Sequence, residues 1–411
     1  MAGEWTPIAL ANVLSFSNGR ASPDRADGLP YPVYGSNGII GFADEANADS
    51  DTIVIGRVGS YCGSLYFSKQ KCWVTDNAIR GSALSDNDTR YLFYLLQTLD
   101  LNHWRAGSGQ PLLNQTILGT IPASLPAPKE QRAIAHILGT LDDKIELNNR
   151  MNEALEAIAR AIFKSWFVDF DPVCAKAEGR DPGLPKDIAD LFPDSFQDSD
   201  LGQIPKGWDL MPVGNALTPV GGGTPSTKEP AYWEGGEYHF ATPKDLSSLS
   251  APILLDTERR ITEDGLSQIS SGLLPAGTVL MSSRAPVGYL AIAAVPVAVN
   301  QGFIAMTCDR RVSNYYALNW CHFNMDEIKQ RASGTTFAEI SKAAFRPIPM
   351  IVPAVETMNR FSNLLHPLYS SIEHNLRQSR TFATIRDTLL PKLISGELRV
   401  PDAERLLSER A

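Results

Sequence analysis

The sequence is poor in cysteine: five residues are scattered over 411 positions, and no two form a Cys-x-x-Cys pair. It therefore lacks the ligand spacing of a zinc site and the pairing of a disulfide framework, and a reducing cytoplasm is the expected compartment. No apolar run is long enough to cross a bilayer, and the opening MAGEWTPIAL lacks the basic and apolar stretches of a signal peptide. The length and an apolar content of 43% predict a globular protein of two or three domains.

Motifs that carry catalysis are also missing. There is no Gly-x-x-x-x-Gly-Lys-Ser/Thr loop, and the glycines 221–223 lead into Thr224-Pro225 rather than an apolar helix, so neither a nucleotide motor nor a dinucleotide or S-adenosylmethionine pocket is indicated. The chain has no Asn/Asp-Pro-Pro-aromatic tetrapeptide of an amino-methyltransferase, and its six histidines form no His-Glu-x-x-His pair. We therefore expect no catalytic residue, metal or cofactor in this chain.

Acidic residues outnumber basic ones, and the net charge is −9. The stretch 168–209 holds ten acids and four bases, a local balance of −6, so the rest of the chain is near neutral. A nucleic-acid interface stays possible, but charge does not favour it.

An internal repeat organises the chain. Trp5, Asn12 and Leu14 match residues 203 positions later, and Pro122 and Pro126 match prolines 227 positions later, so the second copy is longer by 24 residues. Three segments match in between. Thr52–Ile55 resembles Thr278–Met281, with Arg57 or Arg284 following; Asp76–Ile79 resembles Asn300–Phe303; and Ser108–Gln110 resembles Ser333–Thr335.

Each copy reads as an α+β domain. Strands are expected at Thr52–Ile55, Thr278–Met281 and Leu290–Val299, and helices at Tyr91–Leu99 and Tyr315–Gln330.

Each copy ends in a long helical pattern, roughly Lys129–Phe167 and Glu356–Ile394. A 3-4 spacing in the same register predicts a coiled-coil seam between them, although two unrelated helices packed on their own domains are the alternative. The proposed register and docking positions are Ile134, Leu138, Leu141, Ile145, Asn148, Leu155 and Ile162, and Phe361, Leu365, Leu368, Ile372, Asn375, Phe382 and Leu389.

Two buried amides are expected on this seam. Asn148 and Asn375 hold the same seam position near the middle of each helix, where they would fix the register. Equivalent mid-helix positions approach each other when helices run antiparallel, which predicts a pseudo-two-fold chain. Helices of about 38 residues would span roughly 57 Å and hold the two globular units apart as a ruler.

The predicted fold is thus α+β, with two tandem globular domains separated by a pair of long antiparallel coiled-coil helices. A connector rich in Pro and Asp reads as extended, with little regular structure. The expected boundaries are 1–128 and 206–354 for the globular domains, 129–168 and 355–397 for the long helices, 169–205 for the connector and 398–411 for a tail.

This architecture resembles the specificity subunit of type I restriction–modification systems, over nearly the whole chain. The segments that carry the resemblance are Tyr31–Gly41, Pro128–Ala135, Leu141–Asn148, Ile204–Trp208, Gly222–Pro225 and Leu390–Leu398.

The resemblance implies a non-catalytic subunit that binds double-stranded DNA. Two target-recognition domains would each read one half of a bipartite site, with the half-sites about 34 Å apart. The helices would dock two modification subunits, which hold S-adenosylmethionine and methylate adenine, and restriction subunits would add ATP- and Mg-dependent translocation and cleavage. Residues 356–359, Glu-Thr-Met-Asn, depart from the Glu-Gln-Arg start of the first helix, which puts equal docking in doubt.

Loop residues at matched places are the candidate DNA contacts. Asn and Gln pair with adenine and Arg with guanine, although any one such loop can be an ordinary turn. The candidates are Ser36, Asn37, Arg57, Ser60, Tyr61, Asn77, Ser108 and Gln110 in the first copy, and Thr224, Ser226, Lys244, Ser283, Arg284, Asn300, Gln301, Ser333, Thr335 and Thr336 in the second. A coiled-coil scaffold without a DNA role and a cryptic catalytic subunit remain the alternatives.

Overall fold

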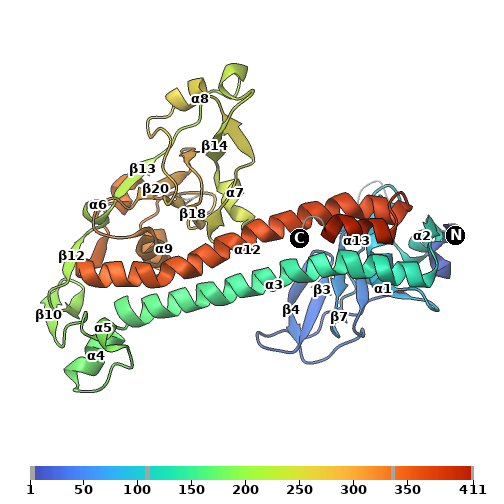
Figure 1. The fold of residues 1–411 in the computed structure, drawn as a ribbon, viewed down its shortest axis with the longest axis horizontal. Coiled ribbons are helices and arrows are strands. Elements are labelled where there is room, and N and C mark those ends of the chain that lie inside the picture. The colour runs from blue at the N-terminus through green and yellow to red at the C-terminus, as the bar shows by residue number, and fades with distance from the viewer. Residues whose placement is uncertain (1–4, 107–111, 335–337, 409–411) are drawn as a thin grey trace. The chain divides into compact units, whose positions relative to one another are not determined.

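The computed structural model describes residues 5–106, 112–334 and 338–408, which form two compact units. Unit 1 combines Met1–Ile145 with Arg380–Ala411, and unit 2 is Glu146–Ser379. The two long helices, α3 (Pro128–Phe167) and α12 (Val355–Ser395), are each divided between the units (Figure 1). Each unit therefore contains part of both helices.

Unit 1 is built on a four-stranded antiparallel sheet in the order β2-β8-β5-β6 and a three-stranded sheet in the order β4-β3-β7, in which β3 and β7 run parallel. A short pair, β1–β9, closes the unit beside α3. The strands are β1 Thr6–Ala9, β2 Leu14–Asn18, β3 Tyr31–Gly35, β4 Gly38–Ala43, β5 Thr52–Gly56, β6 Leu65–Ser68, β7 Trp73–Val74, β8 Ala78–Ala83 and β9 Pro122–Leu125, with helices α1 Thr89–Thr98 and α2 Gln115–Thr120.

Unit 2 repeats this topology. Strands β13-β20-β17-β18 take the order of β2-β8-β5-β6, and β14 and β19 form the parallel pair that β3 and β7 form in unit 1. The strands are β12 Asp209–Pro212, β13 Thr218–Gly221, β14 Tyr238–Ala241, β15 Ile253–Leu254, β16 Arg259–Ile261, β17 Val279–Ser282, β18 Leu290–Ala293, β19 Val297–Val299, β20 Phe303–Thr307 and β21 Pro349–Val352. The helices are α6 Val213–Ala216, α7 Pro243–Ser247, α8 Glu263–Ser267, α9 Asn314–Phe323, α10 Met325–Gln330 and α11 Lys342–Phe345. The internal repeat is confirmed.

Two elements of unit 2 are shorter than predicted. The strand expected over Leu290–Val299 is two strands, β18 and β19, which lie in different sheets. Pro296 precedes β19 and has no N–H to continue a ladder. The helix expected over Tyr315–Gln330 breaks at Asn324, whose side chain donates to the Trp320 carbonyl and competes with the helical backbone bonds.

The long helices run antiparallel within each unit. In unit 1 Arg386 Nη1 lies 2.7 Å from Asp142, and the Lys144 ammonium lies 5.1 Å from the centre of the Phe382 ring. In unit 2 Asn152 bonds to Asn375, and Phe163 packs on Phe361 further along. Residue numbers on α12 fall as those on α3 rise, as the sequence predicts.

The seam residues lie between the helices. Most of the predicted positions are buried, and Ile145, Leu155, Ile162, Leu368 and Phe382 are half-buried. At the unit 2 end the core positions shift by one, because Phe163 and Tyr369 are buried beside Ile162 and Leu368. An α-helix has slightly more than the 3.5 residues per turn of an ideal heptad, so its buried face drifts over several turns.

The two seam asparagines are buried in unit 2, but their side chains do not bond to each other. Asn148 Nδ2 lies within 3.0–3.2 Å of Gln378 Oε1, Ser379 Oγ and the Asn375 carbonyl. Asn375 Nδ2 donates to Asn152 Oδ1 at 2.9 Å. The amides thus form one layer across the seam, and a shift of the helices would separate these buried groups from their present partners.

The connector is not extended, so that prediction is wrong. It contains α4 (Asp171–Ala177), α5 (Lys186–Ala189) and the hairpin β10–β11 (Phe196–Ser199 and Gly202–Pro205). Its apolar residues pack on the end of α3, where Phe192 contacts Trp166 and Trp208. The tail from residue 398 on likewise contains a helix, α13 (Val400–Ser408), and Arg399 pairs with Glu130 at 3.0 Å in unit 1.

The aromatic cluster at the end of α3 generates a stability prediction. Phe163 is 1% exposed and contacts three aromatic rings from α9 and α12, whereas Ile158 on the same helix is 48% exposed. Phe163→Ala should lower the free energy of unfolding by about 3–5 kcal/mol because it opens a cavity in the core. Ile158→Ala should change it by less than about 0.5 kcal/mol. Urea unfolding followed by tryptophan fluorescence measures both, and equal losses would contradict this account of the core.

Candidate nucleic-acid interface

Three loops of unit 1 meet where its strands end. Ser36, in the β3–β4 turn, donates its hydroxyl to the Asn77 carbonyl at 2.5 Å. The Arg57 backbone N–H, after β5, donates to the same carbonyl at 3.1 Å, and the Arg57 guanidinium lies 3.5 Å from the Asp76 carbonyl. The structure thus brings Ser36, Arg57 and Asn77 together.

The remaining unit 1 candidates flank this cluster. Asn37 is exposed in the β3–β4 turn, and Ser60 and Tyr61 are exposed on the single turn Gly59–Tyr61 that follows β5. The Tyr61 side chain is 54% exposed, which is unusual for an aromatic residue in a folded monomer. Ser108 and Gln110 lie outside the described residues.

The matching loops of unit 2 also meet. Thr224 Oγ1 donates to Gln301 Oε1 at 2.5 Å, and the Asn300 side chain accepts from the Gly302 N–H at 2.9 Å. The backbone N–H of Ser283, after β17, donates to the Gly302 carbonyl at 2.8 Å.

Two further unit 2 candidates join this cluster through Glu339. Glu339 forms one isolated antiparallel β-bridge with Arg284 and another with Ser333. The Arg284 guanidinium lies 3.7 Å from the Glu339 carboxylate.

Two predicted contacts lie beside this group. Lys244 is exposed in the first turn of α7 and pairs with Glu258 at 2.7 Å. Ser226 is exposed, and its carbonyl accepts from the Trp233 indole at 3.0 Å. Thr335 and Thr336 lie outside the described residues.

The backbone frames of the two clusters are the same. The bond from Arg57 N–H to Asn77 recurs as Ser283 N–H to Gly302, and the bond from Leu113 N–H to Arg57 recurs as Ile340 N–H to Ser283. Arg57 therefore corresponds to Ser283, and Arg284 to Val58, which is the offset of 226 at which the sequence matches Thr52–Ile55 with Thr278–Met281. The same bonds pair Asn77 with Gly302, so the predicted match of Asp76–Ile79 with Asn300–Phe303 is wrong by one position.

This register also decides what Ser283 can do. Its side chain is 3% exposed, and its backbone N–H and carbonyl are both bonded within the unit. Ser283 holds the loop, while Arg284 beside it is the residue of this pair whose side chain reaches the surface.

Two glycines let the loops approach each other in both units. A Cβ at Gly19 would lie 2.0 Å from the Thr75 carbonyl oxygen, and one at Gly222 would lie 1.8 Å from that of Val299. Only glycine allows this backbone contact. The residues that follow, Arg20 and Gly223, donate their N–H groups to Val74 and Val299 in the same way.

Comparison with known proteins agrees with the duplicated architecture. The model of the family described as type I restriction modification DNA specificity domain matches residues 2–157 and 205–379.

The chain belongs to this family.

Two curated relatives illustrate the similarity. The MjaIX specificity subunit of a type I restriction enzyme from Methanocaldococcus jannaschii is 28% identical over 322 residues, 76% of this chain and 70% of the relative. The HindI specificity subunit from Haemophilus influenzae is 25% identical over 337 residues, 70% of this chain and 71% of the relative. A solved S subunit from M. genitalium has the same fold, with a TM-score of 0.62 at 15% identity over 95% of this chain and 96% of that one.

One candidate contact residue at these loops, Arg20, was not predicted from the sequence. Arg20 is exposed after Gly19, and among the described residues its guanidinium has no hydrogen bond or ion pair. The offset of 203 that aligns Trp5 with Trp208 also places Gly19 on Gly222, so the repeat itself could have found this loop.

The cations at these loops differ in their availability. Arg20 has no ion pair with any residue that the structure describes, whereas Lys244 and Arg284 each pair with a glutamate. The hydrogen bond that Lys244 donates to Glu258 raises the pKa of Lys244, which keeps that side chain charged. A polyanion at these loops would have to compete with Glu258 and Glu339 for their cations, but not at Arg20.

Among the residues that the structure describes, no three His, Cys, Asp or Glu side chains are grouped to hold a metal ion, and no helix has the length and apolar character to span a membrane.

Adjacent glycines of unit 2 give a matched test of the loop frame. Gly222→Ala should lower the free energy of unfolding by about 1–3 kcal/mol, because its Cβ would overlap a backbone oxygen. At Gly223 a Cβ meets no atom within 4 Å, so Gly223→Ala should cost less than about 0.5 kcal/mol. Urea unfolding of the two variants measures the difference, and similar stabilities would refute the close approach.

Proposed function

We propose that this chain is the non-catalytic subunit of a type I restriction–modification enzyme that recognises DNA sequence, and that each globular unit reads one half of a bipartite site. The observation that carries the proposal is the pair of loop clusters, which share one backbone frame but present different side chains. A frame that is kept while its side chains differ is what two readers of different half-sites require.

The side chains at these loops suit base and phosphate contacts. Arg20, Asn37 and Asn77 are exposed in unit 1, and Thr224, Gln301 and Arg284 reach the surface in unit 2. Amides pair bidentately with adenine and guanidinium groups with guanine, while hydroxyls and exposed lysines bind phosphate. The free arginine in unit 1 and the paired one in unit 2 fit two half-sites of different sequence.

The long helices would set the spacing of the half-sites. At 40 and 41 residues, each is about 60 Å long. The amide layer around Asn148 and Asn375 holds a single register, so the distance between matched points on the two helices is constant.

Docking of two modification subunits would need helix residues other than the seam. The seam residues are buried or half-buried between α3 and α12 and are not available to a partner. A second face of α3 is exposed and apolar: Leu147, Met151 and Ile158 are 50%, 44% and 48% exposed, with Ala154 between them. Helical spacing places these four side chains in one stripe, the α3 stripe. Large apolar residues grouped in this way mark a protein interface.

The corresponding face of α12 is different. Adding the repeat offset of 227 to Leu147 and Met151 gives His374 and Gln378, which are exposed and polar. The same offset places Ala154 on the exposed Thr381 and Ile158 on the half-buried Ile385, so three of the four positions are polar on α12. We therefore propose that the modification subunits contact the two helices through chemically different faces. The partners would supply S-adenosylmethionine, and restriction subunits would supply the ATP- and Mg-dependent steps, in the cytoplasm.

DNA recognition is tested with the chain and its modification partner, after the target site is found by mapping methylated adenines in cells that express both. Arg284→Ala and Arg20→Ala should each relax base discrimination in one half-site, and in different halves, by about 1–3 kcal/mol per contacted base. Arg180→Ala, in the connector, is the control. Gel retardation of DNA fragments that carry single base changes in the site measures this discrimination. Retardation that does not depend on the DNA sequence would instead support a scaffold, and binding that is weakened equally for every sequence would make the arginine a phosphate contact.

Partner docking is tested by the double variant Met151→Asp/Ile158→Asp. Two carboxylates in the α3 stripe should weaken association with the modification subunit at least tenfold, because charges are costly to bury in an apolar interface. Glu153→Ala, exposed on another face of α3, should leave association unchanged. Sedimentation of the mixed subunits measures both, and unchanged assembly of the double variant would exclude the stripe.

A further inference from the structure

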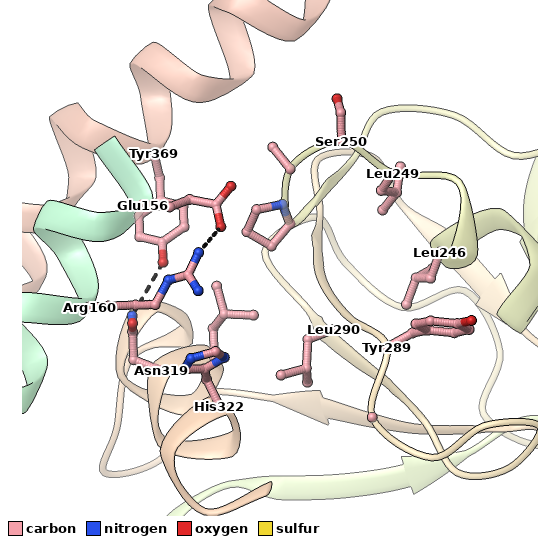
Figure 2. A pocket seen from close by; sticks show the side chains of 14 residues that line it. Glu156, Arg160, Leu246, Leu249, Ser250, Tyr289, Leu290, Asn319, His322 and Tyr369 are labelled. Carbon is pink, nitrogen blue, oxygen red and sulfur yellow. Dashed lines mark hydrogen bonds and ion pairs between the residues drawn. The ribbon is translucent and has the colours of Figure 1, made fainter. Parts of the chain in front are cut away.

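Unit 2 contains a cavity of about 310 Å³ (Figure 2). Four parts of the unit supply most of its walls: Glu156 and Arg160 of α3, Tyr369 of α12, Asn319 and His322 of α9, and the segment 246–252, which begins in α7. Tyr289 and Leu290 complete it. This size lies at the lower end of the range of small-molecule sites.

The cavity has a polar end and an apolar end. Figure 2 shows Glu156, Arg160, Asn319, His322 and Tyr369 gathered on one side. The opposite side is lined by Leu246, Leu249, Leu290 and the ring of Tyr289. A few polar groups facing an apolar wall are the usual make-up of a site that binds and orients a small organic molecule.

The fold that the two units share does not require this cavity. The apolar wall includes the segment 246–252, which belongs to the part of unit 2 between β14 and β17 that carries α7, β15, β16 and α8, whereas unit 1 has only β4 at that place. The polar end differs as well: the bond from Asn319 to Tyr369 takes the place of the bond from Tyr94 to Asp142 in unit 1. The inserted segment and the exchanged side chains together build a feature found in unit 2.

The charges at the polar end already cancel. Arg160 Nη2 lies 2.7 Å from the Glu156 carboxylate, so this pair is neutral as a whole. Burial lowers the pKa of His322, and the positive charge of Arg160 lowers it further. The imidazole is therefore uncharged at neutral pH. A charged ligand would have no counterion, and transfer of its charge from water into the cavity would be unfavourable.

Hydrogen-bonding capacity remains at this end. Among the described interactions, Arg160 uses one terminal nitrogen on Glu156, and the Asn319 side chain donates to Tyr315 and Tyr369 while its oxygen accepts no bond. Arg160 can therefore donate and Asn319 can accept. A ligand that offers both an acceptor and a donor on one edge satisfies both groups.

We propose that this cavity binds a small, neutral, aromatic amide: a planar ring that packs against Tyr289 and the leucines, with a carboxamide-like group at Arg160 and Asn319. None of the proposed DNA contacts lines this cavity, and the proposal does not depend on that function.

Three ligands of the same shape test which charge of ligand the cavity prefers, with the full-length chain and no DNA. Benzamide is neutral, benzoate is anionic and benzamidine is cationic. Ligand-observed NMR titration should show benzamide binding at least tenfold more tightly than either charged analogue. Tighter binding of a charged analogue, or binding of none of the three, would overturn the proposal.

Two variants of similar change locate the binding. Leu249→Trp should fill the apolar end and weaken benzamide binding at least tenfold. Leu273→Trp, on a residue 37% exposed elsewhere in unit 2 and outside the cavity lining, should leave it unchanged. Circular dichroism checks that both variants fold, and benzamide binding that survives Leu249→Trp would place the ligand elsewhere and contradict the proposal.

Discussion

Burial of the seam between α3 and α12 is the interaction on which the rest of the structure depends. The core of unit 1 includes Leu138 of α3 and Leu393 of α12, and that of unit 2 includes Phe163 and Phe361 from the same two helices. Neither globular unit completes its core from its own strands. The helices are therefore parts of both domains, and removing either helix would expose the apolar side of each sheet.

The amide layer gives this seam its specificity. Apolar side chains alone would tolerate a shift of the helices by one heptad, because one leucine replaces another. The asparagines do not tolerate such a shift. Asn148 of α3 bonds to Ser379 of α12, and Asn152, four residues further along α3, bonds to Asn375, four residues back along α12. Asn152 Nδ2 is buried and has no partner in the structure, so the layer also carries a cost in stability. A cost of this kind is consistent with a protein whose proposed task needs one fixed spacing.

The two units share this pair of helices but differ in the side chains of their loops. The backbone bonds that join the loops are the same in both, and the glycines at 19 and 222 allow the same close approach. The side chains around these bonds are not conserved between the units: Arg20 stands where unit 2 has Gly223, and Arg57 where it has Ser283. Unit 2 has also gained the segment between β14 and β17, which contributes to a cavity outside the loops. A rigid frame of backbone bonds permits such changes without loss of the fold.

The sequence by itself determined the duplication, the antiparallel helices and their register, because these depend on periodic apolar positions that persist over many residues. It also determined which loops are equivalent, and an offset of 203 would have found Arg20. Only the tertiary structure decided the rest. The connector folds because Phe192 meets Trp166 and Trp208, which are distant in sequence. The exact match of Asn77 with Gly302 depends on hydrogen bonds between loops, and the cavity at Arg160 forms where five separate segments meet. Contacts of this kind leave no periodic trace in a single sequence.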